Sequence, residues 1–200
     1  LIGAALGLSG AALQGYLRAS NLPPAAFEGK KLWLVNLVMV GAELTQLGVD
    51  FGRGLDLVFL RDAKQAKKRV VEVEGGNRQC AALAAASNGE AAAAMSRFLA
   101  TVRENRMEKR LDEMVSAYRA GDGPTLSRVV QEEFGTSPEG LAARKRVFDD
   151  RHPAMAEAID GYFKQPDSHF VVIGVGRMFG DNNLLEALAK RGVQARRVDN

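Results

Sequence analysis

Apolar residues follow two different periods along the chain. Most of the sequence repeats them every three or four positions, which is the period of an amphipathic α-helix. Three short stretches, at about residues 69–74, 169–175 and 194–198, are instead rich in β-branched residues, as strands are. The helical period occurs at about 31–47, 57–66, 90–120, 124–134, 138–150, 154–163 and 184–191. The pattern predicts a predominantly helical protein with a few short strands.

The C-terminal part contains the clearest succession of elements. The apolar run at 169–175 ends at a Gly-x-Gly, a helical pattern follows at 184–191, and a short run at 194–198 completes the series. Strand, helix and strand in this order predict a βαβ unit, which requires a parallel sheet covered by helices. We therefore expect an α/β fold in which these two strands and the one at 69–74 share a small, mostly parallel sheet.

The glycine turn after residue 173 allows more than one interpretation. Gly174 and Gly176 can adopt positive φ or let the backbone approach a ligand closely. Their spacing resembles a dinucleotide-binding loop, but the acidic residue expected about 20 positions later could only be Asp199, at the chain end. A tight strand-to-helix turn, with Asn183 capping the next helix, is the structural alternative. Nucleotide binding is therefore disfavoured, and a turn and a ligand site both stay open.

The first 17 residues are apolar and contain several glycines. No basic region precedes them, and Gln14 and Arg18 interrupt the apolar run, so the stretch predicts neither a signal peptide nor a membrane span. We expect a loose helix that needs partners.

Composition narrows the class of protein. The chain has 200 residues, of which 46% are hydrophobic and 26% charged, as in a globular domain. Its net charge of +3 is small and its basic residues are mixed with acidic ones, which argues against a nucleic-acid partner. The single cysteine, Cys80, excludes a disulfide framework and a cysteine-based metal site. A basic stripe at 61–69 predicts a solvated helix face, with an anion site as the alternative.

Several motifs resemble those of the TraB/GumN/PrgY family, whose eukaryotic relatives are the TIKI metalloproteases. The Gly-Leu-Asp at 54–56 and the Val-Glu-Val-Glu at 71–74 resemble the family's G-L-D helix and its strand ending in L-E-T. Residues 118–122 resemble its W/Y-x-x-G-D, and Asp-Arg-His at 150–152 resembles its E-R-N. Residues 173–180 resemble its V-G-A-G-H-L-x-G signature. The resemblance implies a single domain over residues 1–200 that lacks the family's N-terminal strand segment.

The departures from the family pattern concern the metal. Members proposed to be peptidases are thought to hold a divalent metal at two G-x-x-H elements. This chain has no G-T-x-H stretch, and Arg177 stands where the G-A-G-H histidine would be. A guanidinium has no lone pair to offer a metal. Of the matched positions only Glu74 offers a ligand, with His152 as a speculative second; capping or an ion pair beside Arg151 is the structural alternative for His152.

Two functions follow from this comparison. The first is a divergent, non-catalytic relative that binds a peptide or another small anionic ligand where parallel strands end, without a cofactor. The alternative is a metal-dependent hydrolase of the TIKI type, with ligands supplied from upstream. The resemblance also suggests an exported or periplasmic protein, whereas oligomeric state and ligand identity stay open. The expected site residues are Glu74 as the catalytic candidate and Arg151, His152, Gly174, Gly176 and Arg177 as ligand-binding residues.

Overall fold

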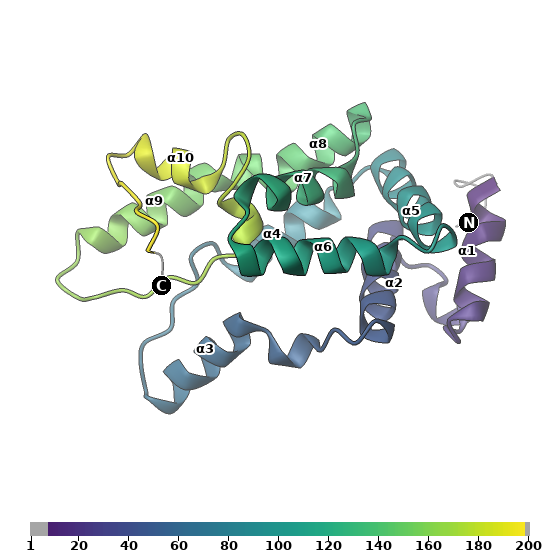
Figure 1. The fold of residues 1–200 in the computed structure, drawn as a ribbon, viewed down its shortest axis with the longest axis horizontal. Coiled ribbons are helices and arrows are strands. Elements are labelled where there is room, and N and C mark those ends of the chain that lie inside the picture. Colours follow the sequence, from purple (N-terminus) through teal and green to yellow (C-terminus); the bar gives the residue numbers. More distant parts are fainter. Residues whose placement is uncertain (1–7, 199–200) are drawn as a thin grey trace.

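The computed structural model describes residues 8–198, which are almost entirely helices joined by short connections (Figure 1). The first seven residues of the apolar N-terminal stretch lie outside this range. Among the described residues no helix is long and apolar enough to cross a membrane. The α-helices are α1 (Leu8–Ala19), α2 (Leu32–Gln46), α3 (Leu55–Gln65), α4 (Gly76–Ala84), α5 (Asn88–Arg103), α6 (Met107–Ala120), α7 (Gly123–Phe134), α8 (Pro138–Val147), α9 (His152–Phe163) and α10 (Leu184–Ala189). Four 3-10 turns accompany them: η1 (Pro24–Phe27), η2 (Phe51–Arg53), η3 (Asp149–Arg151) and η4 (Val175–Arg177).

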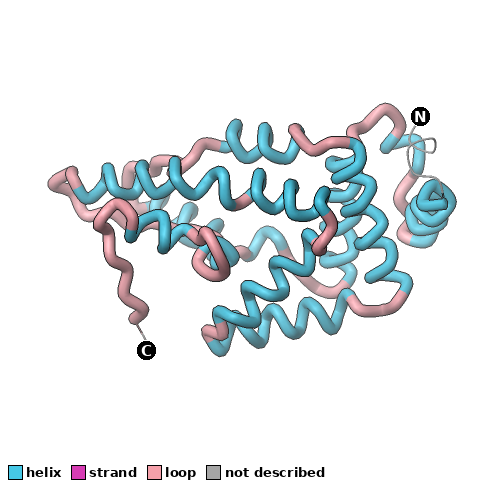
Figure 2. Tube along the Cα trace, turned by 90° about the horizontal axis from the view of Figure 1, so that it is seen from above, coloured by secondary structure: helices cyan, strands magenta, loops and turns pink. Residues whose placement is uncertain are grey.

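The expected parallel sheet is wrong, because no strand occurs within residues 8–198 (Figure 2). The three segments predicted as strands, 69–74, 169–175 and 194–198, lack ladder hydrogen bonds. Part of the pattern behind the prediction is present, since exposure alternates along residues 170–174. Alternating exposure shows that one side of this segment is packed against the protein. A strand also needs a neighbouring backbone with which it can form hydrogen bonds. The fold of the described residues is therefore all-α, not α/β.

Two apolar clusters lie at opposite ends of the molecule (Figure 1). The first joins α1, α2 and α5 around Met39 and Met95, which are fully buried. In it, Tyr16 packs edge-on against Phe98 at 5.3 Å and donates a hydrogen bond to Glu43 at 3.0 Å. The second cluster joins α9 and α10 through a buried set of residues: Met155, Ala156, Ile159, Leu184 and Leu188. Val73, Val171 and Ile173, from the segments predicted as strands, pack against this second cluster.

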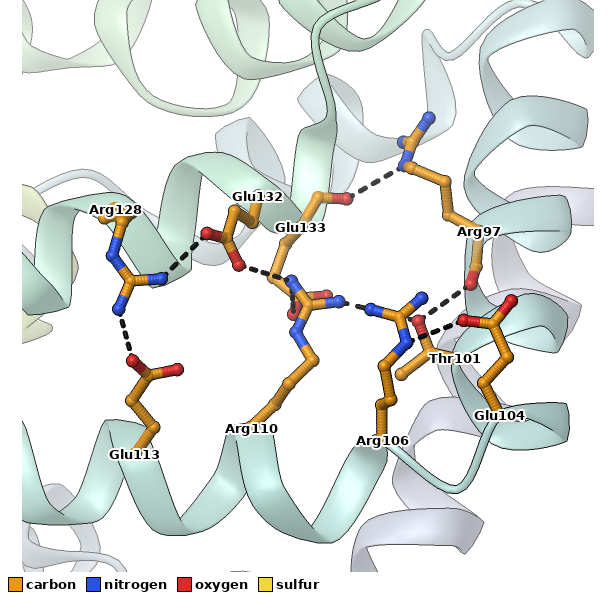
Figure 3. A network of polar contacts seen from close by, with 9 residues as sticks. All are labelled: Arg97, Thr101, Glu104, Arg106, Arg110, Glu113, Arg128, Glu132 and Glu133. Carbon is orange, nitrogen blue, oxygen red and sulfur yellow. Dashed lines mark hydrogen bonds and ion pairs between the residues drawn. The ribbon is translucent and has the colours of Figure 1, made fainter.

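An αα-hairpin occupies the middle of the chain, as the sequence predicts. Gly121 ends α6 in the left-handed conformation, and Asp122 then caps α7 by accepting a hydrogen bond from the Thr125 N–H at 3.1 Å. A network of polar contacts joins the two helices of the hairpin to each other and to α5 (Figure 3). Arg110 of α6 contacts Glu132 and Glu133 of α7 at 3.5 and 3.2 Å, and Arg97 of α5 donates to the Glu133 carbonyl at 3.2 Å. These contacts hold α5, α6 and α7 together, and α7 contributes to the wall of the candidate site.

Candidate functional site

The candidate site forms where α8 turns into α9. Helix α8 ends at Val147, the backbone turns at Phe148, and η3 leads directly into α9. A proline in the first turn of α9 fits there because its missing N–H has no helical acceptor. This tight connection buries Arg151 and His152, which are only 8% and 3% exposed. Two polar side chains that would ordinarily face solvent are thus held inside the protein.

Arg151 forms a two-pronged ion pair with Glu74. Its Nε donates to Glu74 Oε1 at 2.6 Å and its Nη2 donates to Oε2, while Nη1 donates to the Val147 carbonyl at 2.9 Å. Both side chains are 9% exposed, so little water competes with these bonds. The hydrogen bonds from Arg151 lower the pKa of the Glu74 carboxyl, against the opposing effect of burial. Glu74 is therefore an ionised partner of Arg151 at neutral pH.

Arg177 lies beside this pair but has no carboxylate of its own in contact. Its Nη2 donates a long hydrogen bond to the Val147 carbonyl at 3.4 Å, and its guanidinium lies over the Phe148 ring at 4.8 Å. Its Nη1 is buried and has no hydrogen-bond partner among the described residues. Burial lowers the pKa of Arg177, and the positive charge of Arg151 lowers it further. Arg177 is thus a partly buried cation with one buried nitrogen that has unused hydrogen-bonding capacity.

His152 is fixed in one tautomer by the loop before α10. Its Nδ1 lies 2.6 Å from the carbonyl oxygen of Asn182, which can only accept, so Nδ1 carries the proton. Burial lowers the pKa of His152, and the ring is therefore neutral at pH 7. Its Nε2 is buried and has no hydrogen-bond partner within the part of the chain described. The unprotonated Nε2 can accept a hydrogen bond from an N–H or O–H group.

A small pocket, open to solvent and with enclosed room for about one water molecule, lies against these groups. Its lining residues come from α7, α8, the α8–α9 connection and the loop around η4: Ser127, Val130, Gln131, Arg144, Phe148, Asp149, His152, Gly176, Phe179 and Asp181. Gly176 allows the η4 turn to approach α7, because a Cβ there would lie 3.3 Å from Val130 and 3.7 Å from Phe148. Arg177 does not line the pocket, but its guanidinium lies over the ring of Phe148, which does. The lining combines aromatic rings with polar side chains.

The structure brings most of the expected site residues together, without the sheet on which the expectation was based. Arg151 and Arg177 both donate to the Val147 carbonyl, Glu74 accepts from Arg151, and His152 follows Arg151 in the chain. The ion pair with Glu74 is made by Arg151, not by Arg177. Neither Gly174 nor Gly176 has positive φ; the close approach belongs to Gly176 alone.

Sequence reasoning missed the pocket walls. Phe148 and Asp149 lie two to three residues before the Arg-His pair at 151–152, but the helical period placed them on a helix surface. Ser127, Val130 and Gln131 recur at i, i+3 and i+4, and this spacing alone puts them on one face of α7. Their mixed polarity did not distinguish that face from a solvated one.

The metal implied by the family resemblance does not fit the residues present. Both oxygens of Glu74 accept hydrogen bonds from Arg151, and Arg177 has no lone pair. His152 contributes one free nitrogen, whereas a metal site needs three or four converging ligand atoms. Within residues 8–198 no group of three or more His, Cys, Asp or Glu side chains could hold a metal ion.

Comparison with known proteins identifies the family to which the chain belongs. Residues 9–197 match the sequence profile described as the TraB/PrgY/gumN family. The chain is also similar to the uncharacterized protein YbaP of Escherichia coli strain K12 and to that of Shigella flexneri, each 32% identical over 71 residues. These matches span 36% of this chain and 27% of each relative, or about a quarter of the relatives' length. No solved structure gives a significant match.

Proposed function

This chain belongs to the TraB/PrgY/gumN family, and from that premise we propose that it binds a peptide, through its carboxylate, in the pocket beside His152. The observation that carries the proposal is a pair of buried nitrogens of opposite hydrogen-bonding character. Among the described residues, neither Arg177 Nη1 nor His152 Nε2 has a hydrogen-bond partner. Both residues contact the Phe148 ring. Buried polar groups are nearly always satisfied, so an unpaired donor and an unpaired acceptor around one ring favour a missing ligand.

The two nitrogens call for different groups on the ligand. Arg177 Nη1 is a charged donor and favours a carboxylate, which guanidinium groups bind strongly. His152 Nε2 is an acceptor, since the proton is on Nδ1, and it favours an N–H. The end of a peptide offers a carboxylate next to an amide N–H, whereas inorganic phosphate at neutral pH offers mostly acceptors. This difference is why we propose a peptide rather than a simple anion.

Charge around the site supports an anionic group. Glu74 and Arg151 neutralise each other, and Arg144 lies 3.7 Å from Asp149, so both cations already have carboxylate partners. Arg177 has only the Val147 carbonyl and the Phe148 ring. A buried charge without an opposite partner costs several kcal/mol, which a bound carboxylate would offset. Because Nη1 is closed off from solvent, binding also requires the side chains around it, such as the Phe148 ring, to move.

The test compares a short N-acetylated alanine peptide that has a free C-terminal carboxylate with the same peptide amidated. Isothermal titration calorimetry of the unmodified protein should show at least about tenfold tighter binding of the carboxylate form, which corresponds to about 1.4 kcal/mol. Arg177→Gln should remove this preference, because glutamine keeps hydrogen-bonding groups but has no charge. His152→Phe should weaken both peptides alike. Arg61→Gln, an equal charge change at an exposed position of α3, should have no effect.

Two results would contradict the proposal. The first is an Arg177→Gln variant that is folded by circular dichroism and still prefers the carboxylate. The second is the absence of binding to the unmodified protein for both peptides. We also expect mass spectrometry to recover the peptide intact after incubation, and cleavage would overturn the view that the protein binds without catalysing hydrolysis.

A further inference from the structure

The connection between α3 and α4 is an unpaired strand-like segment (Figure 1). Residues 68–72 contain no turn or bend, and every residue from 64 to 72 is exposed. Its two central valines, Val70 and Val71, are 48% and 52% exposed. Among the hydrogen bonds of residues 8–198, none uses the backbone N–H or carbonyl of residues 69–73. An apolar, β-branched segment with a free backbone edge is a template for pairing with another chain.

The charges along this segment favour one partner and one orientation of pairing. Basic residues occupy its start, at 67–69, and Glu72 and Glu74 occupy its end. A parallel pair of identical segments would place like charges together, whereas an antiparallel pair places opposite charges together. With Arg69 opposite Glu72 of a second copy, Val70 lies opposite Val71 of that copy, and the twofold axis repeats both pairs. We infer that this edge pairs antiparallel with the same segment of a second copy of the chain.

Local structure prepares the segment for such a pairing. Lys67 has a positive φ of 52°, which ends the helical region and redirects the backbone. At the other end, Glu72 accepts a hydrogen bond from the Gly76 N–H at 3.0 Å, which holds its carboxylate at the end of the segment. Neither Arg69 nor Glu72 takes part in an ion pair with another described residue. Both charges are therefore available to a second copy.

The surroundings of the segment supply the additional area that an interface needs. A two-stranded ribbon alone is marginally stable in water. Helix α3 has no buried residue, and its Phe59 contacts Phe170 edge-on, with ring centroids 5.0 Å apart. Phe59 and Phe170 are still 41% and 75% exposed, and Leu57 is 42% exposed. These side chains form an apolar margin that a second copy would cover together with the paired segments.

The test measures association of the full chain by analytical ultracentrifugation at concentrations up to about 100 μM. The unmodified protein should dimerise. Arg69→Glu places two glutamates opposite each other twice and should weaken the dimer at least about tenfold, given two cross-strand charge pairs. Glu72→Arg should weaken it similarly. The double variant Arg69→Glu/Glu72→Arg restores both pairs and should recover the dimer. Lys30→Glu, an equal charge change at an exposed position before α2, is the control.

Every other result overturns the inference. If the protein stays monomeric, the edge does not pair with a second copy. A different occupant, such as another segment of a longer polypeptide, would then cover it. A dimer that Arg69→Glu leaves unchanged uses another surface. If both single variants weaken the dimer and the double variant does not restore it, the two segments do not pair in the proposed register.

Discussion

Replacing Glu74 by glutamine removes the charge that holds Arg151, and it should destabilise the protein strongly. The glutamine has almost the same shape but offers one neutral acceptor in place of two charged oxygens, each of which now accepts from Arg151. A hydrogen bond to a charged group contributes about 1.5–3 kcal/mol and a neutral one about 1 kcal/mol. The variant also leaves Arg151 and Arg177 buried together without a neighbouring negative charge.

We expect a loss of about 3 kcal/mol in the free energy of unfolding, at the lower end of what breaking a buried ion pair costs. For a chain of this size that corresponds to a fall of about 6–12 °C in Tm. Urea unfolding followed by circular dichroism at 222 nm measures the difference directly. The double variant Glu74→Leu/Arg151→Met removes both charges and should lie within about 1 kcal/mol of the unmodified protein.

Glu113→Gln is the matched control. Glu113 pairs with Arg128 on the surface, where its side chain is 38% exposed, and the same substitution should change stability by less than about 0.5 kcal/mol. A Glu74→Gln variant as stable as this control would refute the reasoning. A double variant as unstable as the two single changes summed would also refute it, because the loss would then come from packing rather than from an unpaired charge.

Two further predictions concern His152 and the glycines. The buried His152 has a pKa below its ordinary 6.5, so the folded state binds fewer protons than the unfolded chain and stability should fall as pH drops below about 6.5. His152→Phe should flatten this window in urea titrations, whereas the loss due to the lowered pKa of Glu74 should persist below about pH 4.5. Gly123→Ala would place a Cβ 2.4 Å from the Phe179 ring and should cost about 1–3 kcal/mol. Gly161→Ala meets nothing within 4 Å in α9 and should stabilise by up to about 1 kcal/mol in thermal unfolding, and equal effects at the two glycines would contradict the close packing at Gly123.

The sequence predicts the helices of this protein well and its sheet wrongly, for a single physical reason. Helix signals are local: Asp122 accepts a hydrogen bond from Thr125 three residues on, and Asn183 accepts one from Glu186. Each cap is complete within one turn of chain and needs nothing from elsewhere. A strand depends on a second backbone at hydrogen-bonding distance, which no local pattern supplies. The valines at 70–73 therefore indicate a half-packed segment without indicating what pairs with it.

The sequence placed three charged residues of the candidate site near one another, but it predicted neither the pocket walls nor which charges pair. The motif resemblance brought Glu74, Arg151 and Arg177 into one site; the two arginines donate to one carbonyl oxygen, that of Val147, and Glu74 accepts from Arg151. Which arginine takes the carboxylate depends on the η3 turn, which aims Arg151 at Glu74 and leaves Arg177 across the Phe148 ring. Arg177 occupies the position of the motif's histidine, yet it does not pair with Glu74. Of the two arginines, it is the one without a carboxylate partner, which is why we propose that a ligand carboxylate pairs with it.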